Sequence, residues 1–147
     1  MTLIPQLRDQ IREMFPPAPL RMPLSKELWE GQDFSVYLRN SSKTVDGKRY
    51  HAIVVARVDL SPALEGRGYF RELCTAVEAL AEKHPFIQVI SHECVLNPKV
   101  AAMLLRHGYR EIPHLDEGIS SDFIKWAKAT PVSLEMQNSG HKSLAAN

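Results

Sequence analysis

The sequence predicts an α/β (α+β) domain with a mixed central sheet and helices on both faces. Two β-rich runs, 33–39 and 49–60, flank a polar loop containing Asp46-Gly47, a pattern typical of an antiparallel hairpin. The second run is followed by a helix and then by the continuous apolar run FIQVI (86–90), typical of a strand covered on both faces. This βαβ unit requires a right-handed crossover and a parallel pair of strands, so the sheet must be mixed.

The chain of 147 residues is long enough for one hydrophobic core and short for two domains. We therefore expect a single domain over 1–129, with a helical N-terminal part (1–31) and a core that holds the sheet (32–129). From residue 130 onward polar residues and glycine replace the apolar pattern, so 130–147 is expected to be a mobile tail.

Two helices are predicted before the first β-rich run. Residues 3–15 carry apolar side chains at helical spacing, and the proline-rich stretch 16–23 ends this helix. The segment LSKELWE (24–30) predicts a short second helix with Ser25 as its N-cap and Gly31 at its end.

The second half of the chain continues with helices and strands. A helix that follows the glycines of 66–68 is expected to end near His84-Pro85. The segment NPKVAAMLLRHG (97–108) has Asn as N-cap, Pro at the first helical position and Gly at its end. YREIP (109–113) and SDFIKWAKA (121–129) are expected to form the last strands.

Composition and charge argue against several classes of function. The 18 Lys and Arg are balanced by 17 Asp and Glu and form no stripe, so no nucleic-acid partner is expected. No apolar run reaches the roughly 18 residues that cross a bilayer, so no membrane partner is expected. Two cysteines without a signal peptide predict a cytoplasmic protein, and the histidines lack the spacing of metal ligands.

The stretch LSPALEGRGYFREL (60–73) raises the main functional question. Gly66 and Gly68 permit positive φ and leave no Cβ in the way of a ligand. The first amides of the following helix have no intrahelical acceptor and lie at the positive end of the helix dipole, so such a turn can hold a phosphate. Taken alone, Gly-x-Gly before a helix is more often only a tight loop.

The order of motifs over residues 50–127 resembles the GNAT acetyltransferase superfamily. The family pattern of an apolar strand, Pro-x-x-Arg-Gly-x-Gly-x-Gly/Ala and a Leu-rich helix is similar to VDLSPALEGRGYFRELCTAVEALA, through Pro62, Gly66 and Gly68. The second family signature, Asn-x-x-Ala-x-x-Leu-Tyr-x-x-x-Gly-Phe, is similar to NPKVAAMLLRHGY, through Asn97, Gly108 and Tyr109.

This resemblance implies a site for acetyl-CoA. In the family the turn amides hold the pyrophosphate, the strand before the turn splays from its parallel neighbour and pairs with the pantetheine arm, and the Asn that starts the second helix lies beside that arm. Asn97 is equally well explained as a helix cap. The implied cofactor-binding residues are Val58, Leu60, Glu65, Gly66, Arg67, Gly68, Tyr69 and Asn97.

Three departures from the family pattern touch the same site. Glu65 replaces the usual Arg or Gln of the loop and brings a negative charge to the expected pyrophosphate position, where Arg67 is a candidate for compensation. Phe70 replaces a small residue and either crowds the phosphate or packs inward. Leu104 replaces the Tyr that in many members protonates the departing CoA thiolate.

Asp59 and His92 are the candidate catalytic residues. A regular strand over 50–60 places Asp59 on one face with Arg57, beside the expected thioester, whereas a bulge breaks this parity. Pairing with Arg57 or capping of the loop is the alternative for Asp59. His92 follows the central strand at its C-terminal end, where open α/β sheets place ligands, with Glu93 as an alternative base. A Cys94 nucleophile is less expected, and Cys74 and Tyr109 are expected to pack in the core.

The expected function is transfer of an acetyl group from acetyl-CoA to an amine of a protein, peptide or small molecule, without a metal. Two alternatives stay open. One is a catalytically inactive GNAT-fold module that binds and regulates a partner protein, and the other is a CoA-binding protein without catalysis. GNAT proteins often pair, so the N-terminal helix is a candidate homodimer interface, although covering its own sheet is its expected use.

Overall fold

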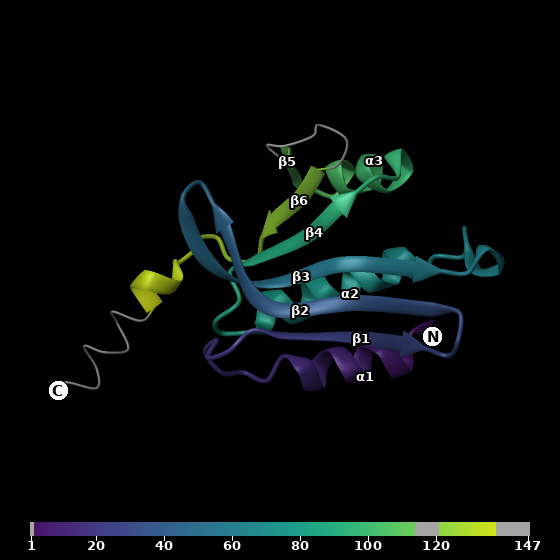
Figure 1. Ribbon diagram of the computed structural model, residues 1–147, viewed down its shortest axis with the longest axis horizontal. Coiled ribbons are helices and arrows are strands. Elements are labelled where there is room, and N and C mark those ends of the chain that lie inside the picture. The colour runs from purple at the N-terminus through teal and green to yellow at the C-terminus, as the bar shows by residue number, and fades with distance from the viewer. Residues whose placement is uncertain (1, 114–120, 138–147) are drawn as a thin grey trace.

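A computed structural model describes residues 2–113 and 121–137 of the chain. Its six-stranded sheet has the order β1-β2-β3-β4-β6-β5 (Figure 1). β3 and β4 are parallel and the other neighbouring strands of this sheet are antiparallel, so the predicted mixed sheet is confirmed. The strands are β1 (Leu24–Glu30), β2 (Phe34–Val45), β3 (Lys48–Leu60), β4 (Val89–Val95), β5 (Arg110–Pro113) and β6 (Ser121–Trp126), and the helices are α1 (Pro5–Met14), α2 (Tyr69–Lys83) and α3 (Pro98–Arg106).

Residues 24–30 form the edge strand β1, and the helix predicted there is wrong. Each residue of β1 pairs with β2, from Leu24 opposite Asn40 to Glu30 opposite Phe34. A helix of seven residues is marginal on its own, because few hydrogen bonds follow its costly nucleation. The ladder to β2 satisfies the same backbone groups and buries Leu28, so tertiary pairing outweighs the helix propensity of Lys26 and Glu27.

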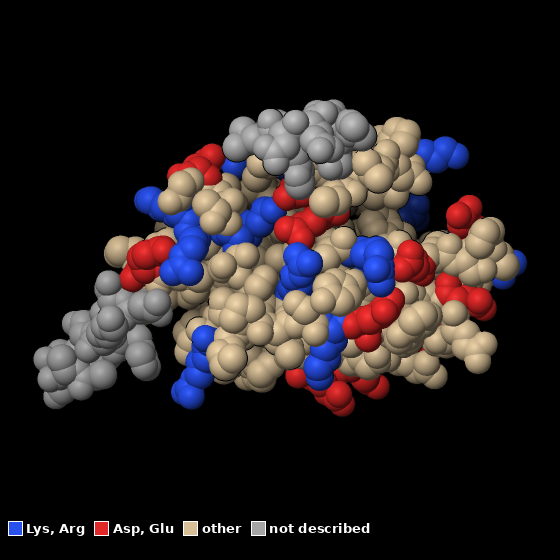
Figure 2. Space-filling model, viewed as in Figure 1, with Lys and Arg blue, Asp and Glu red and all other residues tan. Residues whose placement is uncertain are grey.

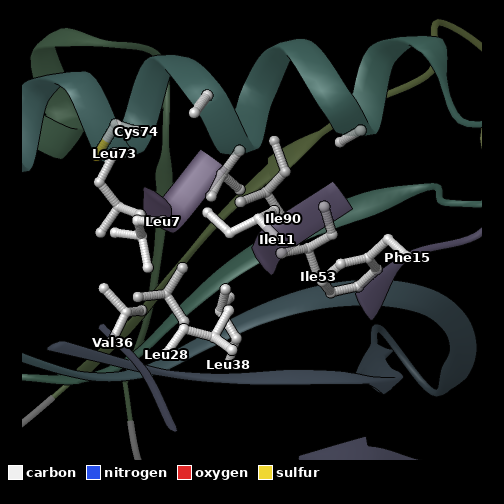
Figure 3. Packing of buried hydrophobic residues seen from close by; sticks show 14 of the residues in the cluster. Leu7, Ile11, Phe15, Leu28, Val36, Leu38, Ile53, Leu73, Cys74 and Ile90 are labelled. Atoms are coloured by element: carbon white, nitrogen blue, oxygen red, sulfur yellow. The ribbon is translucent and has the colours of Figure 1, made fainter. Parts of the chain in front are cut away.

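The main core lies between the helices and one face of the sheet. Leu7 and Ile11 of α1 and Leu73 of α2 meet Leu38 and Ile53 of the strands in one buried cluster (Figure 3). α1, α2 and α3 all contribute side chains to this cluster. The other members of the buried cluster include Ile4, Met14, Phe15, Leu28, Val36, Val55, Val77, Ile90, Leu104 and Phe123.

The second face of the sheet is covered by the end of the β2–β3 hairpin, residues 41–50, which we call the arm. Asp46 and Gly47 both have positive φ, 50° and 82°, so the turn is the two-residue type that Asp-Gly favours. The arm bends toward β4 and β6 (Figure 1), where Val45 packs with Ile124 in a second buried cluster. At its tip, a carboxylate oxygen of Asp46 lies 3.3 Å from a guanidinium nitrogen of Arg110 in β5.

Residues 131–137, part of the expected mobile tail, pack against the end of the sheet. The Val132 N–H donates to Gln88 Oε1 at 3.0 Å, and Ser133 and Leu134 are buried. Glu135 also pairs with Arg49 of the arm. Residues 138–147, the rest of the expected tail, lie outside the described residues. None of the described helices is both long enough and apolar enough to pass through a membrane.

Candidate functional site

The parallel strands β3 and β4 separate toward their carboxyl ends. Their register runs from Ala52 opposite Val89 to Val55 opposite His92, although β3 continues to Leu60 and β4 to Val95. Each strand has an irregularity near the point of separation. Tyr37 of β2 pairs with Arg57 and its neighbour Leu38 with Val55, so Ala56 is an extra, bulged residue in β3. In β4, Cys94 has a φ of 52°, where the register with β6 also shifts.

A cleft of about 580 Å³ lies between the diverging strands. Open α/β sheets commonly bind ligands outside the carboxyl ends of their parallel strands, so its position matches the prediction. One wall comes from β3 and the turn after it, and the other from β4 and the start of α3. The lining residues are Val55, Ala56, Arg57, Val58, Leu60, Glu65, Gly66, Phe70, His92, Glu93, Cys94, Val95, Leu96, Asn97, Lys99 and Val100.

The Gly-Arg-Gly turn lies at one end of this cleft. Gly66 and Gly68 have φ values of 75° and 92°, so both adopt the left-handed conformation that the sequence predicts for them. A Cβ on Gly66 would meet no atom within 4 Å, and space is therefore open above this peptide. The α2 helix begins directly after its N-cap residue Gly68, which has no side chain with which to cap the first amides. The Tyr69 ring packs edge-on against Phe34, with 5.8 Å between centroids, and is half-buried.

His92 lies where the strands separate and is 2% exposed. Its ring packs edge-on against Phe70 and Tyr109, with centroid distances of 5.9 Å and 5.2 Å. Burial lowers the pKa of His92 to about 4, so the imidazole is neutral at physiological pH. Within the described part of the chain, its Nε2 has no hydrogen-bond partner. His92 is therefore a buried, neutral imidazole that lines the cleft and is able to accept a proton.

The three departures from the family pattern have different structural outcomes. Phe70 packs inward against His92 and leaves the cleft open. Leu104 is fully buried in the main core and carries no proton to donate. Glu65 is exposed and lines the cleft. Tyr109, as expected, packs in the core, and burial raises its pKa far above the usual range, so its hydroxyl stays protonated.

Arg39 of β2 and Lys43 of the arm reach the cleft wall formed by β4. Arg39 Nη1 donates to Glu93 Oε1 at 2.8 Å, and Lys43 Nζ to Glu93 Oε2 at 3.5 Å. Lys43 also pairs with Asp122 of β6, whose Oδ1 accepts the Cys94 N–H at 2.9 Å. These contacts hold the irregular part of β4 in place. On the face that Figure 2 shows, positive and negative side chains are interspersed.

Asp59 lies away from the cleft, and the face predicted for it is wrong. The extra residue Ala56 reverses the alternation of side chains, so Val58 and Leu60 point to the main core and Asp59 to the opposite face. Its Oδ2 lies 3.0 Å from Arg57 Nε, the alternative contact that the sequence suggests. Arg57 also donates to Glu27 at 2.9 Å. A catalytic role for Asp59 stays a prediction that these contacts do not favour.

Asn97 caps α3 and also lines the cleft. Its Oδ1 accepts the Lys99 N–H at 2.9 Å, and the residue is exposed. Capping and ligand contact are therefore compatible, because the cap occupies only the oxygen. Val58 and Leu60 line the cleft as the resemblance implies, and Arg67 is exposed beside it.

Sequence reasoning missed the roles of Arg39 and Lys43. Both lie in the segment predicted to be a hairpin strand and a polar loop, far in sequence from Glu93 and Asp122. A polar residue of either sign in such a segment is ordinarily solvated, so no local signal identifies these partners. The polar run SHEC after the apolar run was the signal that did point to Glu93.

The fold is that of the GNAT acetyltransferases. An acyl-CoA N-acyltransferase from Klebsiella pneumoniae, described as putative, has a similar structure with a TM-score of 0.50 and 15% identity, over 82% of this chain and 84% of that one. An acetyltransferase from Thermus thermophilus is similar with a TM-score of 0.50 and 16% identity, over 81% of this chain and 71% of that one.

A further solved structure is a mutant of the toxin AtaT bound to acetyl-CoA and to the C-terminus of the antitoxin AtaR. It has a TM-score of 0.47 and 18% identity over 66% of this chain, which spans 60% of the length of that toxin. No family model matches the chain, and a search of curated proteins found no match.

Proposed function

We propose that the protein is an acetyl-CoA-dependent N-acetyltransferase whose acetyl donor lies between β3 and β4. The observation that carries this proposal is the separation of the two strands after Val55 and His92. It opens a cleft that extends from the Gly-Arg-Gly turn to a buried, neutral imidazole. The similar fold of the acyl-CoA N-acyltransferase from Klebsiella pneumoniae supports the same class of donor.

Each part of acetyl-CoA has a chemically suitable partner along the cleft. The diphosphate accepts hydrogen bonds from the amides of Gly66 to Tyr69, because these amides precede or begin α2 and the glycines leave room for close approach, whereas the Glu65 N–H already donates to the Pro62 carbonyl at 3.3 Å. The pantetheine arm follows Val58 and Leu60 on one side and Asn97 on the other. The acetyl group then lies near His92, where the strands meet.

The reaction forms a C–N bond and breaks the C–S bond of the thioester. The amine attacks the acetyl carbonyl in its unprotonated form, and the neutral His92 accepts a proton from the positively charged nitrogen of the tetrahedral intermediate. Burial lowers the pKa of the His92 imidazolium to about 4, which makes it a stronger acid than an exposed one, and it returns this proton to the departing thiolate. His92 thereby serves in both steps, and no donor is needed at Leu104. The net reaction moves one proton from nitrogen to sulfur.

The acceptor enters from the second face, where Arg57 and Glu93 line the cleft. Both side chains are already paired within the protein, Arg57 with Glu27 and Asp59, and Glu93 with Arg39. They define a polar entrance of balanced charge, which suits an amine of a protein, peptide or small molecule alike.

The first test is thermal unfolding with increasing acetyl-CoA. A ligand present at about 100 times its Kd and bound only by the folded protein adds roughly 2.7 kcal/mol of stability. Gly66→Asp places a carboxylate against the diphosphate and should abolish the shift. Gly47→Asp is the matched control, since Gly47 also has positive φ and open space around it but lies at the arm tip.

Release of free CoA thiol in the presence of amine acceptors then tests the transfer itself. No thermal shift at millimolar acetyl-CoA would contradict the proposal. A shift without thiol release from any amine would instead support a CoA-binding protein that has lost catalysis. If neither a thermal shift nor thiol release is observed, the remaining hypothesis is a catalytically inactive module that binds a partner protein.

A further inference from the structure

The two cysteines of the chain have opposite environments. Cys74 lies on the core side of α2 and is 6% exposed, and burial raises the pKa of its thiol to about 12. Cys94 of β4 is an exposed, free thiol, and it lines the cleft between β3 and β4. The Cys74 thiol is therefore protonated and shielded at neutral pH, whereas a molecule in the cleft can contact Cys94 directly.

Cys94 is held at a break in the pairing of β4. Its φ is 52°, and its N–H donates to Asp122 Oδ1 at 2.9 Å. Across this break, the register with β6 passes from the pair His92–Phe123 to the pair Val95–Ser121. Cys94 thus has no partner in the register with β6, and its anchored backbone fixes the thiol at the wall of the cleft.

A buried polar group without a partner lines the same cleft. His92 is 2% exposed, and its Nε2 has no hydrogen-bond partner among residues 2–113 and 121–137. An unpaired polar atom that is buried costs free energy, so a ligand that brings a polar group to this end of the cleft is favoured. Cys94 follows two residues later on β4, about 7 Å away at the rise of a strand. Both residues therefore border the same short stretch of the cleft.

We infer that Cys94 is a site of covalent modification by CoA, through a mixed disulfide that closes the cleft to acetyl-CoA. The inference rests on the proposed function, in which the sulfur end of the donor lies near His92, and adds a means of regulating that site. CoA disulfide, the oxidised form of the free thiol, carries the same diphosphate and pantetheine arm as acetyl-CoA. It presents a disulfide where acetyl-CoA presents its thioester, beside Cys94.

The reaction is a thiol–disulfide exchange, in which the number of disulfides is unchanged. The Cys94 thiolate attacks one sulfur of CoA disulfide, so an S–S bond forms to that CoA and the S–S bond of the reagent breaks. The second CoA leaves as a thiolate and takes up the equivalent of the proton that Cys94 gave to solvent. A small thiol reverses the step by the same exchange. The attached CoA fills the cleft, so acetyl transfer stops until it is removed.

The test incubates the whole protein with CoA disulfide and measures the adduct by mass spectrometry. One CoA should be added, peptide mapping should locate it at Cys94, and dithiothreitol should remove it. Cys94→Ser should gain no CoA, whereas the matched control Cys74→Ser should still gain one. Peptide mapping of the unmodified sequence gives the same answer without relying on the folding of either variant.

Two comparisons show whether the cleft directs the reaction. Binding of CoA disulfide in the cleft raises the local concentration of its sulfur, so it should react at least about 10-fold faster than glutathione disulfide at equal concentration. Acetyl-CoA should slow the modification in proportion to its occupancy of the cleft. Equal rates for the two disulfides would show an exposed thiol without recognition and would overturn the inference. A CoA adduct whose formation acetyl-CoA does not slow would also overturn it.

The remaining outcomes separate this inference from the proposed function. If no adduct forms while acetyl-CoA still raises the unfolding temperature, the inference is overturned and the donor site stands. If CoA disulfide modifies Cys94 selectively while acetyl-CoA causes no thermal shift, the modification site is supported and acetyl-CoA is overturned as the donor. If neither an adduct nor a thermal shift is observed, both are overturned.

Discussion

Val55 and His92 form the last parallel pair between β3 and β4. Val55 lies directly before the bulged residue Ala56 of β3, and His92 lies two residues before Cys94, the residue of β4 with positive φ. His92 therefore occupies the closed end of the cleft, where both strands still shield it, while the residues that follow it line open walls. This position explains how one side chain can be almost fully buried and still belong to the site.

Replacement of His92 by Gln should lower kcat by about 100-fold, because the amide fills the space but cannot shuttle a proton. The KM for acetyl-CoA should change little, since the diphosphate and pantetheine contacts lie elsewhere. Steady-state kinetics of thiol release measures both values. The exposed His107 provides the control as His107→Gln. An unchanged kcat in His92→Gln would remove His92 from the mechanism.

Asn97 can be tested for its two roles separately. Asn97→Ala removes the cap of α3 and should lower the free energy of unfolding by about 0.5–2 kcal/mol. Asn97→Ser keeps a capping oxygen and should restore most of that stability. If Asn97 also contacts the pantetheine arm, Asn97→Ser should still bind acetyl-CoA more weakly than the unmodified protein. Denaturant unfolding and calorimetry together decide between the roles, and full affinity in the Ser variant would leave only the cap.

The protein should lose stability in mild acid because of its buried histidines, which include His51 and His84 in addition to His92. His51 Nε2 lies 2.7 Å from Asn40 Oδ1, and His84 Nδ1 accepts the N–H groups of Phe86 and Ile87 at 3.1 Å and 3.2 Å. Burial, with a smaller contribution from the neighbouring His84, lowers the pKa of His51 to about 4, and burial also lowers the pKa of His84.

Because these folded-state pKa values lie below the usual 6.5, the unfolded chain binds more protons in acid. Stability should be constant above pH 6.5 and fall as the pH drops toward 4, by up to about 1.4 kcal/mol per pH unit for each histidine. Urea unfolding at pH 7, 5.5 and 4.5 measures this slope. His51→Gln should make the slope shallower by the contribution of one histidine, because the lowered pKa values of His84 and His92 remain. An unchanged slope would show that His51 is not a source of the acid sensitivity.

Lys43 and Asp122 should be energetically coupled. Their side chains are only 14% and 10% exposed, so removing one leaves a largely buried charge with fewer partners. Asp122→Asn and Lys43→Met should each lower the free energy of unfolding by about 1–3 kcal/mol. The double variant should lose less than the sum of the two, which a double-mutant cycle measures. Strict additivity would mean that the contact carries little energy.

The elements that sequence reasoning predicted correctly are set by local chemistry. Asp46-Gly47 favours one type of hairpin turn, and Gly66 and Gly68 permit positive φ. The Asn-Pro pair at 97–98 favours the start of a helix through its N-cap and its first helical position. Each signal acts within a few residues of itself and needs no distant partner. These signals were enough to locate the turn, the parallel pair and hence the position of the cleft.

The errors arise where distant contacts decide. Residues 24–30 form a strand because they pair with β2, and no residue pattern within the segment indicates this pairing. Asp59 turns away from the cleft because one bulged residue, Ala56, reverses the parity of the strand after it. Arg39 of β2 reaches Glu93 of β4 only because these two strands lie on either side of β3 in the sheet. In each case the local pattern permits the alternative, and packing selects between them.

The arm has a consequence for the order in which the chain folds. Its partners in β5 and β6 lie more than 60 residues away in sequence, so its docking closes a far longer loop than the hairpin turn does. Docking of the arm should therefore come late, after the folding transition state. Val45→Ala should accelerate unfolding and leave the folding rate nearly unchanged in stopped-flow experiments. A matching decrease in the folding rate would instead place the arm in the folding nucleus.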